Sequence, residues 1–381
     1  MYRHPSSTRR PAGKLTRAGL LGLAALIWGV TVLAEPTDLA GREIDLPGKV
    51  DRVLLGEGRF LVPTSILEGE EAIDRIVGMQ GEFKRLDPAG YTRFRAAFPA
   101  VDEIPRVGRL NPSSFSVERA LSMAPDVAFF GLEGHGPSPG DRPVIERLEQ
   151  AGVTVVFIDF RHDPLTNTVP SMRLMGEVLG RQEEAEAFIS AYQREMARVD
   201  DGLAEVETQP DVFLESRVGL REECCETMSN GMLGLLVERA GGNNIATDLL
   251  PGSHGLVSLE YLLSHQPDIY IGTAIGSKND KAHNGHIVLG AGVSEAQARQ
   301  SLDVTLQRRG IREFEAVKNG RAHAIWHHFY NSPFNVVALQ AFAKWLHPEA
   351  FRDLEPAETF DRLRARFLPY ETTGTYWIKQ R

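Results

Sequence analysis

The densest group of residues able to bind a ligand is Trp326-His327-His328-Phe329-Tyr330. Aromatic faces pack against flat apolar ligands, whereas imidazole and phenol groups offer hydrogen bonds or metal ligation. The group begins at the last residue of a predicted strand, 321–326, and open α/β sheets place their binding sites at strand ends. We therefore expect these side chains to contact a ligand. The alternative is the end of a core strand that carries surface histidines.

Three arginines and one further histidine occupy comparable positions. Each lies just after a predicted strand or in a turn expected to face the same cleft: Arg59, Arg109, Arg217 and His254. The guanidinium fork matches a carboxylate, so together the arginines could hold an anionic ligand. Each of them taken alone is more often a surface charge.

The only two cysteines are adjacent, Cys224 and Cys225. Three interpretations compete: a disulfide between neighbours, two free thiols, or soft-metal ligands together with Met228 and a histidine. In an oxidising compartment exposed thiols rarely persist, which favours a vicinal disulfide with an apolar edge toward the cleft. Ferric iron prefers oxygen ligands, so direct binding by the cysteines would indicate Ni, Cu or Zn.

The N-terminal residues indicate export. Four cations between Arg9 and Arg17 precede an uncharged, largely apolar stretch, 18–34, that ends in Ala34. This pattern predicts a signal peptide over 1–34 and a mature chain that starts near Glu35. The alternative is an uncleaved anchor helix. No cysteine precedes Cys224, so there is no lipobox, and we expect a protein free in the bacterial periplasm whose export route, Sec or twin-arginine, stays open.

Composition narrows the function further. The chain is 42% hydrophobic and 24% charged, which is typical of a globular protein. Its formal net charge of -9 argues against nucleic-acid binding, because that requires a basic face. After signal cleavage no segment reaches membrane-spanning length.

The elements that must position these residues alternate between strands and helices. Candidate strands lie at 52–55, 76–78, 127–130, 153–158, 211–215, 269–271 and 321–326, with helical patterns between them. This alternation predicts the α/β class with parallel sheets covered on both faces. We expect two Rossmann-like α/β lobes joined by a single long α-helix: an N-terminal lobe over 38–163, a connecting helix over 164–207, and a C-terminal lobe over 208–381.

The connecting segment has a distinct pattern. Apolar residues recur every three or four positions from Ala185 to Leu203, which predicts a long amphipathic helix with a possible break near Gly180. A coiled-coil dimer is the alternative, although strict heptad spacing is lacking.

One supersecondary unit occurs twice. A short helix with Glu118 near its start leads to Pro125-Asp126 and a strand, and a second helix with Glu260 leads to Pro267-Asp268 and another strand. A carboxylate suits the positive end of a helix dipole, which is the simplest explanation of either glutamate alone. The repetition indicates two similar lobes.

The two repeated units and several other sequence segments resemble those of a known family, and the resemblance extends over nearly the whole mature chain. Among them are 151–156 (AGVTVV), 241–246 (GGNNIA) and 343–349 (AKWLHPE). The chain resembles the periplasmic substrate-binding proteins of ABC importers that handle iron–siderophore complexes, haem and cobalamin. The resemblance implies two lobes, one rigid connecting helix, modest closure and a ligand held between the lobes. It also implies that Glu118 and Glu260 pair with arginines of the membrane permease.

We therefore expect a periplasmic solute-binding protein that captures a ferric siderophore or similar metal chelate and delivers it to an ABC permease. It should be no enzyme and hold no resident cofactor, and the sequence assigns no metal ligands. Within the class, one alternative ligand is haem, bound through Tyr330 or a histidine. The other alternative ligand is cobalamin. Outside it stand a soft-metal (Ni, Cu, Zn) protein, a sensory module, and an exported metal-dependent enzyme built on His327 and His328. No HExxH, GxSxG or P-loop motif supports the enzyme.

Overall fold

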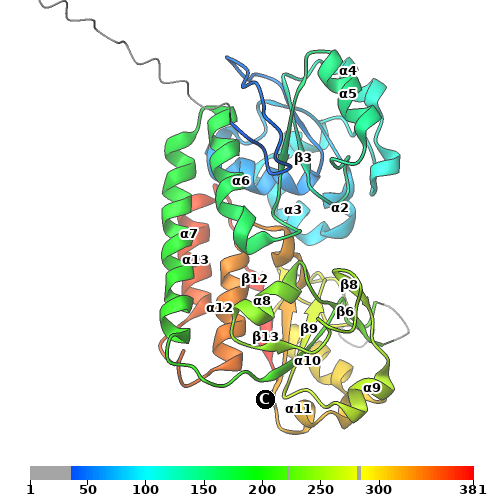
Figure 1. Cartoon of the computed structure of the whole chain (residues 1–381), viewed down its shortest axis with the longest axis vertical. Helices are drawn as coiled ribbons and strands as arrows, with labels where there is room; N and C mark the ends of the chain where they lie inside the picture. Colours follow the sequence, from blue (N-terminus) through cyan, green and yellow to red (C-terminus); the bar gives the residue numbers. More distant parts are fainter. Residues whose placement is uncertain (1–35, 221–223, 281–284) are drawn as a thin grey trace, which may run out of the picture. The chain divides into compact units, whose positions relative to one another are not determined.

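The computed structural model describes residues 36–220, 224–280 and 285–381, and Glu35–Arg381 forms one compact unit. The signal peptide predicted over 1–34 lies outside the described residues. Within those residues, no helix combines the length and apolar character needed to cross a bilayer. The unit contains two lobes, each built around its own principal sheet (Figure 1).

The sheet of the first lobe is entirely parallel, in the order β2-β1-β3-β4. Its strands are short and almost wholly buried: β1 (Val53–Leu55), β2 (Ile76–Met79), β3 (Val127–Gly131) and β4 (Thr154–Ile158). Helices cover it: α1 (Leu61–Glu68), α2 (Glu82–Leu86), α3 (Pro88–Ala97), α4 (Val117–Ser122) and α5 (Arg142–Gln150). Because the strands are parallel, all their carboxyl ends lie at one edge, and the loops after them can share one site.

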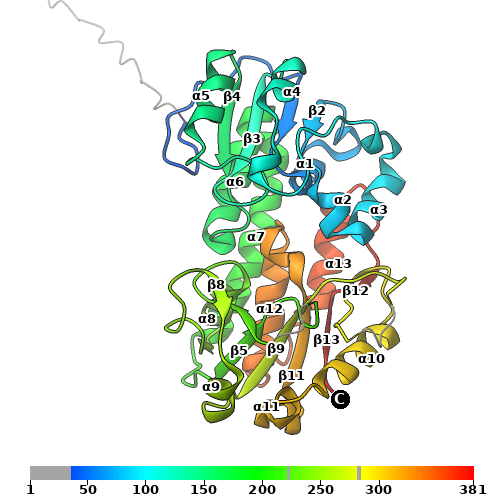
Figure 2. The same cartoon turned by 90° about the vertical axis from the view of Figure 1, so that its right-hand side faces the viewer.

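The sheet of the second lobe is mixed. Its centre is the parallel trio β5 (Asp211–Glu215), β9 (Ile269–Ala274) and β11 (Ala322–Trp326), which lie side by side in Figure 2. Antiparallel strands flank it: β6 (Glu226–Met228), β8 (His254–Leu256) and β13 (Trp377–Lys379). These flanking strands were not predicted, because three residues are too few to show an alternating pattern.

Short elements and helices complete the second lobe. The minor strands are β7 (Asn243–Asn244), β10 (Gly290–Ala291) and β12 (Gly374–Thr375). The helices are α8 (Leu233–Arg239), α9 (Leu259–Ser264), α10 (Glu295–Leu306), α11 (Glu315–Lys318), α12 (Asn335–Leu346) and α13 (Pro356–Phe367). The two sheets and their helices match the predicted α/β class of two lobes.

The predicted connecting helix is two helices, α6 (Pro164–Leu179) and α7 (Gln182–Leu203). Gly180 ends α6 in the left-handed conformation with φ 69°, which glycine adopts without a Cβ penalty. The chain then reverses, and α6 packs against α7. Of these two helices, α7 runs beside both lobes, over about 33 Å at 1.5 Å per residue (Figure 1).

The apolar side of α7 is buried within the same chain. Phe188 and Tyr192 are fully covered, and α7 contacts α1 of the first lobe as well as α12 and α13 of the second. Phe188 stacks edge-on against Phe334 and Phe367, with ring centroids 6.0 and 5.2 Å apart. This packing makes α7 a stiff support that touches both lobes.

The segment after α13 also reaches the first lobe. The ring of Tyr370 lies 5.4 Å from that of Phe94 and 6.2 Å from that of Phe98, both next to or within α3. Tyr370 belongs to the range predicted for the C-terminal lobe, 208–381. The boundaries at 163/164 and 207/208 stay predictions.

Candidate ligand site between the two lobes

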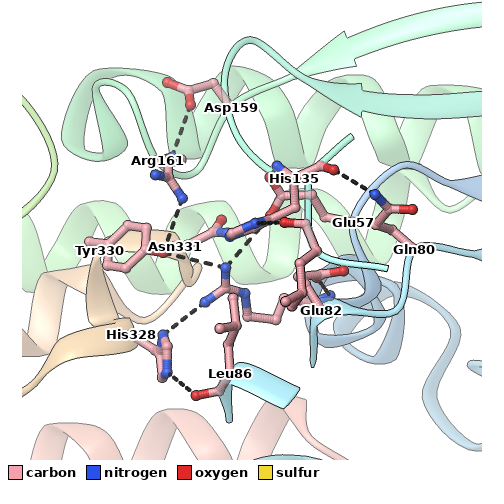
Figure 3. Close-up of polar contacts among 12 residues, drawn as sticks. Glu57, Gln80, Glu82, Leu86, His135, Asp159, Arg161, His328, Tyr330 and Asn331 are labelled. Carbon is pink, nitrogen blue, oxygen red and sulfur yellow. Dashed lines mark hydrogen bonds and ion pairs between the residues drawn. The ribbon is translucent and has the colours of Figure 1, made fainter. Parts of the chain in front are cut away.

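Side chains from the strand ends of both lobes meet in one polar cluster (Figure 3). Arg59 follows β1 and is only 4% exposed. Its Nη1 donates to Nδ1 of His328 over 2.8 Å, and its Nη2 donates to Oη of Tyr330 over 3.3 Å. His328 and Tyr330 belong to a 3-10 turn, His327–Asn331, directly after β11. The two strand ends therefore face each other across the lobe boundary.

The hydrogen bonds of His328 determine its tautomer. A guanidinium has no acceptor, so Nδ1 of His328 must accept the hydrogen bond from Arg59. The other nitrogen, Nε2, then carries the proton and donates it to the carbonyl oxygen of Leu86 over 3.0 Å. Burial and the charge of Arg59 hold the pKa of His328 well below its usual range. His328 is a neutral ring with both nitrogens occupied.

Arg161 is a second cation at the site, held by a loop after β4. Asp159, 1% exposed, accepts the backbone N–H groups of Arg161 and His162 at 2.9 and 2.7 Å. It also accepts from Asp163 and Asn167. This loop directs Arg161 toward Tyr330, and Nη1 donates to Oη over 3.0 Å (Figure 3).

The phenol of Tyr330 lies between two guanidinium groups. Burial alone would raise the pKa of Tyr330, but the charges of Arg59 and Arg161 outweigh it and lower that pKa. The two cations favour the anionic phenolate form of Tyr330, and hard metal ions prefer anionic oxygen ligands.

Two buried carboxylates, those of Glu57 and Glu82, accept hydrogen bonds from residues of the cluster. Glu57 accepts from Nδ2 of Asn331 at 2.7 Å and from the backbone N–H of His135 at 3.0 Å, which links the lobes again. Burial raises the pKa of Glu82 to about 7, with Glu57 adding to the rise and Arg59 opposing it. Oε1 of Glu82 accepts the backbone N–H of Arg59 at 3.0 Å, whereas Oε2 is buried without a hydrogen bond in the described chain.

A cavity of about 240 Å³ opens beside Tyr330, between the lobes. The first lobe contributes Leu86, His135 and Arg161. The second contributes Ser216, Arg217, Glu226, Met228, Met232, His254, Ile275, His327, His328 and Tyr330. Its wall is therefore rich in hydrogen-bond donors, with two thioethers as the polarizable apolar part.

The site brings together most of the predicted ligand contacts. Arg217, His254, His327, His328 and Tyr330 line the cavity, and Arg59 bonds to two of them from behind. Arg217 also pairs with Glu226 of β6.

The other predicted contacts lie elsewhere. Phe329 is fully buried, and it lines with Trp326 a second cavity of about 70 Å³, to which Arg59 and His328 also contribute. The indole N–H of Trp326 has no partner among the described residues. A 3-10 turn repeats every three residues, so His327 and Tyr330 share a side that Phe329 does not. Arg109 is exposed and off the cavity wall, and its backbone N–H donates to Oγ of Ser114 at 2.8 Å.

Arg161 was missed by sequence reasoning. It follows the strand that gives the strongest sequence signal, 153–158, so the strand-end rule that selected Arg59 applies to it equally. His135 was not missed in this way, because the turn after β3, 131–135, was among the loops expected to contact the ligand, and His135 lines the cavity.

The cysteines are joined as a disulfide, but not at the cavity wall. Cys225 is fully buried in the core of the second lobe, and Cys224 is partly buried against it. The expectation that their ring faces the cleft is therefore corrected: Cys225 directly precedes β6, and its side chain points to the core side of the sheet. Among the described residues, no three His, Cys, Asp or Glu side chains gather closely enough to hold a metal ion.

The repeated helices have the same local structure. Ser116 caps α4 by accepting from the backbone N–H of Arg119, and Ser258 caps α9 by accepting from that of Tyr261. Glu118 and Glu260 thus stand in matching first turns, both exposed. Glu118 pairs with Arg147 at 2.9 Å, whereas the carboxylate of Glu260 has no partner within the described residues.

Comparisons with known proteins agree with this architecture. The chain is similar to the TroA-like periplasmic binding protein FepB of Veillonella parvula, with 26% identity, a TM-score of 0.80, and coverage of 91% of this chain and 100% of that one. The molybdate-binding protein of a Haemophilus influenzae ABC transporter shares the fold at 17% identity and a TM-score of 0.64, with coverage of 87% and 97%.

A curated relative is a cobalamin-binding protein of Halobacterium salinarum, 24% identical over 185 residues. That match covers 48% of this chain and 47% of the relative, so the chain spans about half the length of the curated relatives it matches. The family model for periplasmic binding proteins matches residues 81–325, which include β3 and β4 of the first sheet, the central strands of the second sheet up to Ile325, and most of the cavity wall. The chain belongs to the periplasmic binding protein family.

Proposed function

We propose that this protein, a periplasmic binding protein of the ABC transporter class, captures an anionic metal chelate such as a ferric siderophore. The observation that carries the proposal is the cavity between the lobes, to which Arg161 contributes from one lobe and Arg217 and His327 from the other. A ligand seated there contacts both lobes at once. Binding would therefore stabilise one arrangement of the lobes for a permease to recognise.

The chemistry of the wall favours an anionic ligand. Arginine and lysine donate hydrogen bonds and cannot accept them, and a guanidinium binds carboxylate-like oxygens in a fork geometry. Arg161 has one Nη group bound to Tyr330, while its Nε is buried without a hydrogen-bond partner among the described residues. A ligand oxygen in the cavity would add an acceptor to a site that has a surplus of donors.

The size of the cavity favours a compact ligand. Its volume of about 240 Å³ lies just under the range of roughly 300–1,000 Å³ typical of drug-sized ligands. A small ferric chelate fits this space better than a corrinoid does. The thioethers of Met228 and Met232 can pack against the apolar backbone of such a chelator.

Delivery to a permease is assigned to the repeated helices. Glu118 and Glu260 present one exposed carboxylate on each lobe, from helices capped in the same way. Exposed ion pairs are individually weak, so we expect the two contacts to control register and association rate more than affinity. Export through a signal peptide over 1–34 belongs to the same proposal.

Haem is the second candidate, favoured by Tyr330. Its phenol accepts hydrogen bonds from Arg59 and Arg161, and an anionic phenolate is a good ligand for ferric iron. His328 is a poor haem ligand, because both of its nitrogens are already hydrogen-bonded. Cobalamin is a third candidate, by likeness to the Halobacterium salinarum relative.

Calorimetric and absorption titrations separate these candidates. Purified protein is titrated with ferric citrate, a ferric hydroxamate, a ferric catecholate, haem and cobalamin. We expect saturable binding of a ferric chelate, weakened about tenfold or more in Arg161→Ala, since a lost charged hydrogen bond costs about 1.5–3 kcal/mol. The matched control is Arg109→Ala, whose exposed side chain is off the cavity wall. A haem complex with a Soret band that shifts in Tyr330→Phe, and no chelate binding, would overturn the proposal in favour of haem.

A further inference from the structure

His327 has one ring nitrogen that faces a buried hydroxyl. Its Nδ1 lies 2.9 Å from Oγ1 of Thr273, the residue before the last of β9, and Thr273 is fully buried. The same Oγ1 accepts the backbone N–H of Arg217 at 2.7 Å. Three strand ends of the second lobe, those of β5, β9 and β11, thus converge on one hydroxyl group.

The hydrogen of this hydroxyl has one available acceptor. A threonine hydroxyl donates one hydrogen bond and accepts up to two. The backbone N–H of Arg217 takes one acceptor position, and Nδ1 of His327 is the remaining polar neighbour of Oγ1 among the described residues. An unmade hydrogen bond in a fully buried position is costly, so the hydroxyl donates to Nδ1. The proton of the neutral ring of His327 is therefore on Nε2.

The second ring nitrogen is available for a ligand. His327 lines the cavity, and its Nε2 has no hydrogen-bond partner in the described part of the chain. Burial, followed by the charges around it, keeps the pKa of His327 well below its usual range, so the ring is neutral. Nε2–H is thus a fixed, neutral donor on the cavity wall.

We propose that His327 selects the ligand by donating Nε2–H to an acceptor atom of the bound chelate, and that Thr273 is the positioning residue that fixes this tautomer. This inference rests on the proposed function. A ring whose Nε2 carries the proton cannot offer that nitrogen's lone pair to a metal ion. The site therefore discriminates against an uncomplexed divalent ion and favours a metal already wrapped in a chelator with outward-facing oxygens.

The backbone conformation of Arg217 fixes the direction of its N–H group toward Thr273. Arg217 has φ 48°, a conformation that non-glycine residues rarely adopt, and this turn directs its N–H at Thr273. The side chain of Arg217 meanwhile pairs with Glu226 at the cavity wall. One residue thus orients the histidine through its backbone and contributes to the electrostatics of the cavity through its side chain.

The tautomer is measured directly by nitrogen-15 NMR of histidine-labelled protein without ligand, with the His327 signals assigned by their loss in His327→Gln. We expect a protonated Nε2 and an unprotonated Nδ1 in the wild type and in Thr273→Ser. Thr273→Val, which keeps the size but removes the hydroxyl, should yield a mixture of tautomers. A protonated Nδ1 in the wild type would overturn the inference.

Binding of a ferric chelate supplies the second readout. We expect His327→Leu to weaken binding about tenfold, the loss of one good hydrogen bond. His327→Gln, whose amide can donate from a similar position, should restore most of it, and Thr273→Val should weaken binding while Thr273→Ser does not. Nickel chloride alone should show no saturable binding that depends on His327, and such binding would contradict the inference.

The two ideas fail in different ways. If a ferric chelate binds normally to His327→Leu, the proposed function stands and the role of His327 is overturned. If no chelate binds to any variant while the NMR signals show protonated Nε2, the proposed function and the ligand contact both fail, but the positioning by Thr273 survives.

Discussion

Arg161 Nη1 of the first lobe lies 3.0 Å from Tyr330 Oη of the second. Arg59 donates to the same oxygen over 3.3 Å, so a single phenol holds two cations from the opposite lobe. This contact lies at the wall of the cavity and at the boundary of the lobes. Ligand charge placed beside it will act on both lobes through one network.

The phenol of Tyr330 should ionise at a lower pH than an ordinary tyrosine. The arginines lower the pKa of Tyr330 despite its burial, whereas burial raises the pKa of Tyr192, Tyr370 and Tyr376. In an ultraviolet titration of the folded protein, we expect one tyrosine to ionise below the ordinary value of about 10. That step should vanish in Tyr330→Phe and persist in Tyr376→Phe. An unchanged first step in Tyr330→Phe would contradict the assignment.

Glu82 should make the protein less stable as pH rises. Its folded pKa of about 7 lies above the ordinary 4.5, mainly because of burial, so the folded state binds more protons between these values. The free energy of unfolding should therefore fall from about pH 4.5 to about pH 7. Glu82→Gln should remove that part of the slope and be more stable than the wild type at pH 8, by on the order of 1–3 kcal/mol.

Urea unfolding at a series of pH values measures this effect. Glu70→Gln, at an exposed position of the same lobe, is the matched control and should leave the slope unchanged. Asp87, whose pKa burial raises to about 6, should keep a smaller slope of the same sign in Glu82→Gln. A Glu82→Gln protein with the full slope of the wild type would show that Glu82 ionises normally.

Sequence alone could place much of the site, because its residues follow strands. The rule that binding residues follow strands identified Arg59, Arg217 and the turn after β11. The same rule applies to Arg161, which follows β4. Which side chains meet could not be read from the sequence, since the Arg59–His328 contact joins residues 269 positions apart. The inward direction of Phe329 follows from a 3-10 turn with no signature in the sequence.

The repeated glutamates should be needed for transport but not for binding. With Glu118→Lys and Glu260→Lys together, we expect uptake of radioactive iron chelate to be abolished while the affinity of the purified protein is unchanged. The matched control is Glu103→Lys, another exposed first-lobe glutamate, which should transport normally. Intact uptake in the double variant would refute the docking role.

Arg147 adds a finer prediction about the same surface. It holds Glu118 at 2.9 Å in an exposed pair, and Glu260 has no such partner within the described residues. Arg147→Ala should leave the free energy of unfolding within about 0.5 kcal/mol, since exposed pairs contribute little. It should raise the association rate with permease in nanodiscs, and a slower association would contradict competition for Glu118.

The two cysteines should form a disulfide, and Cys225 should be more deeply buried than Cys224. Alkylation of the native protein followed by mass spectrometry should modify neither thiol without reductant. Both Cys224→Ser and Cys225→Ser remove the disulfide, but only the second buries a hydroxyl in the core, which should cost about 1–3 kcal/mol more. Two alkylatable thiols in the native protein would refute the disulfide, and equal stabilities would refute the difference in burial.

Native mass spectrometry of the protein purified from its own periplasm tests the central claim most directly, because it weighs whatever the cavity holds. We expect an added mass equal to one chelator plus one metal ion, present in the wild type and in Arg109→Ala but depleted in Arg161→Ala. An added mass of a bare metal ion, or of haem, retained in Arg161→Ala would contradict the account.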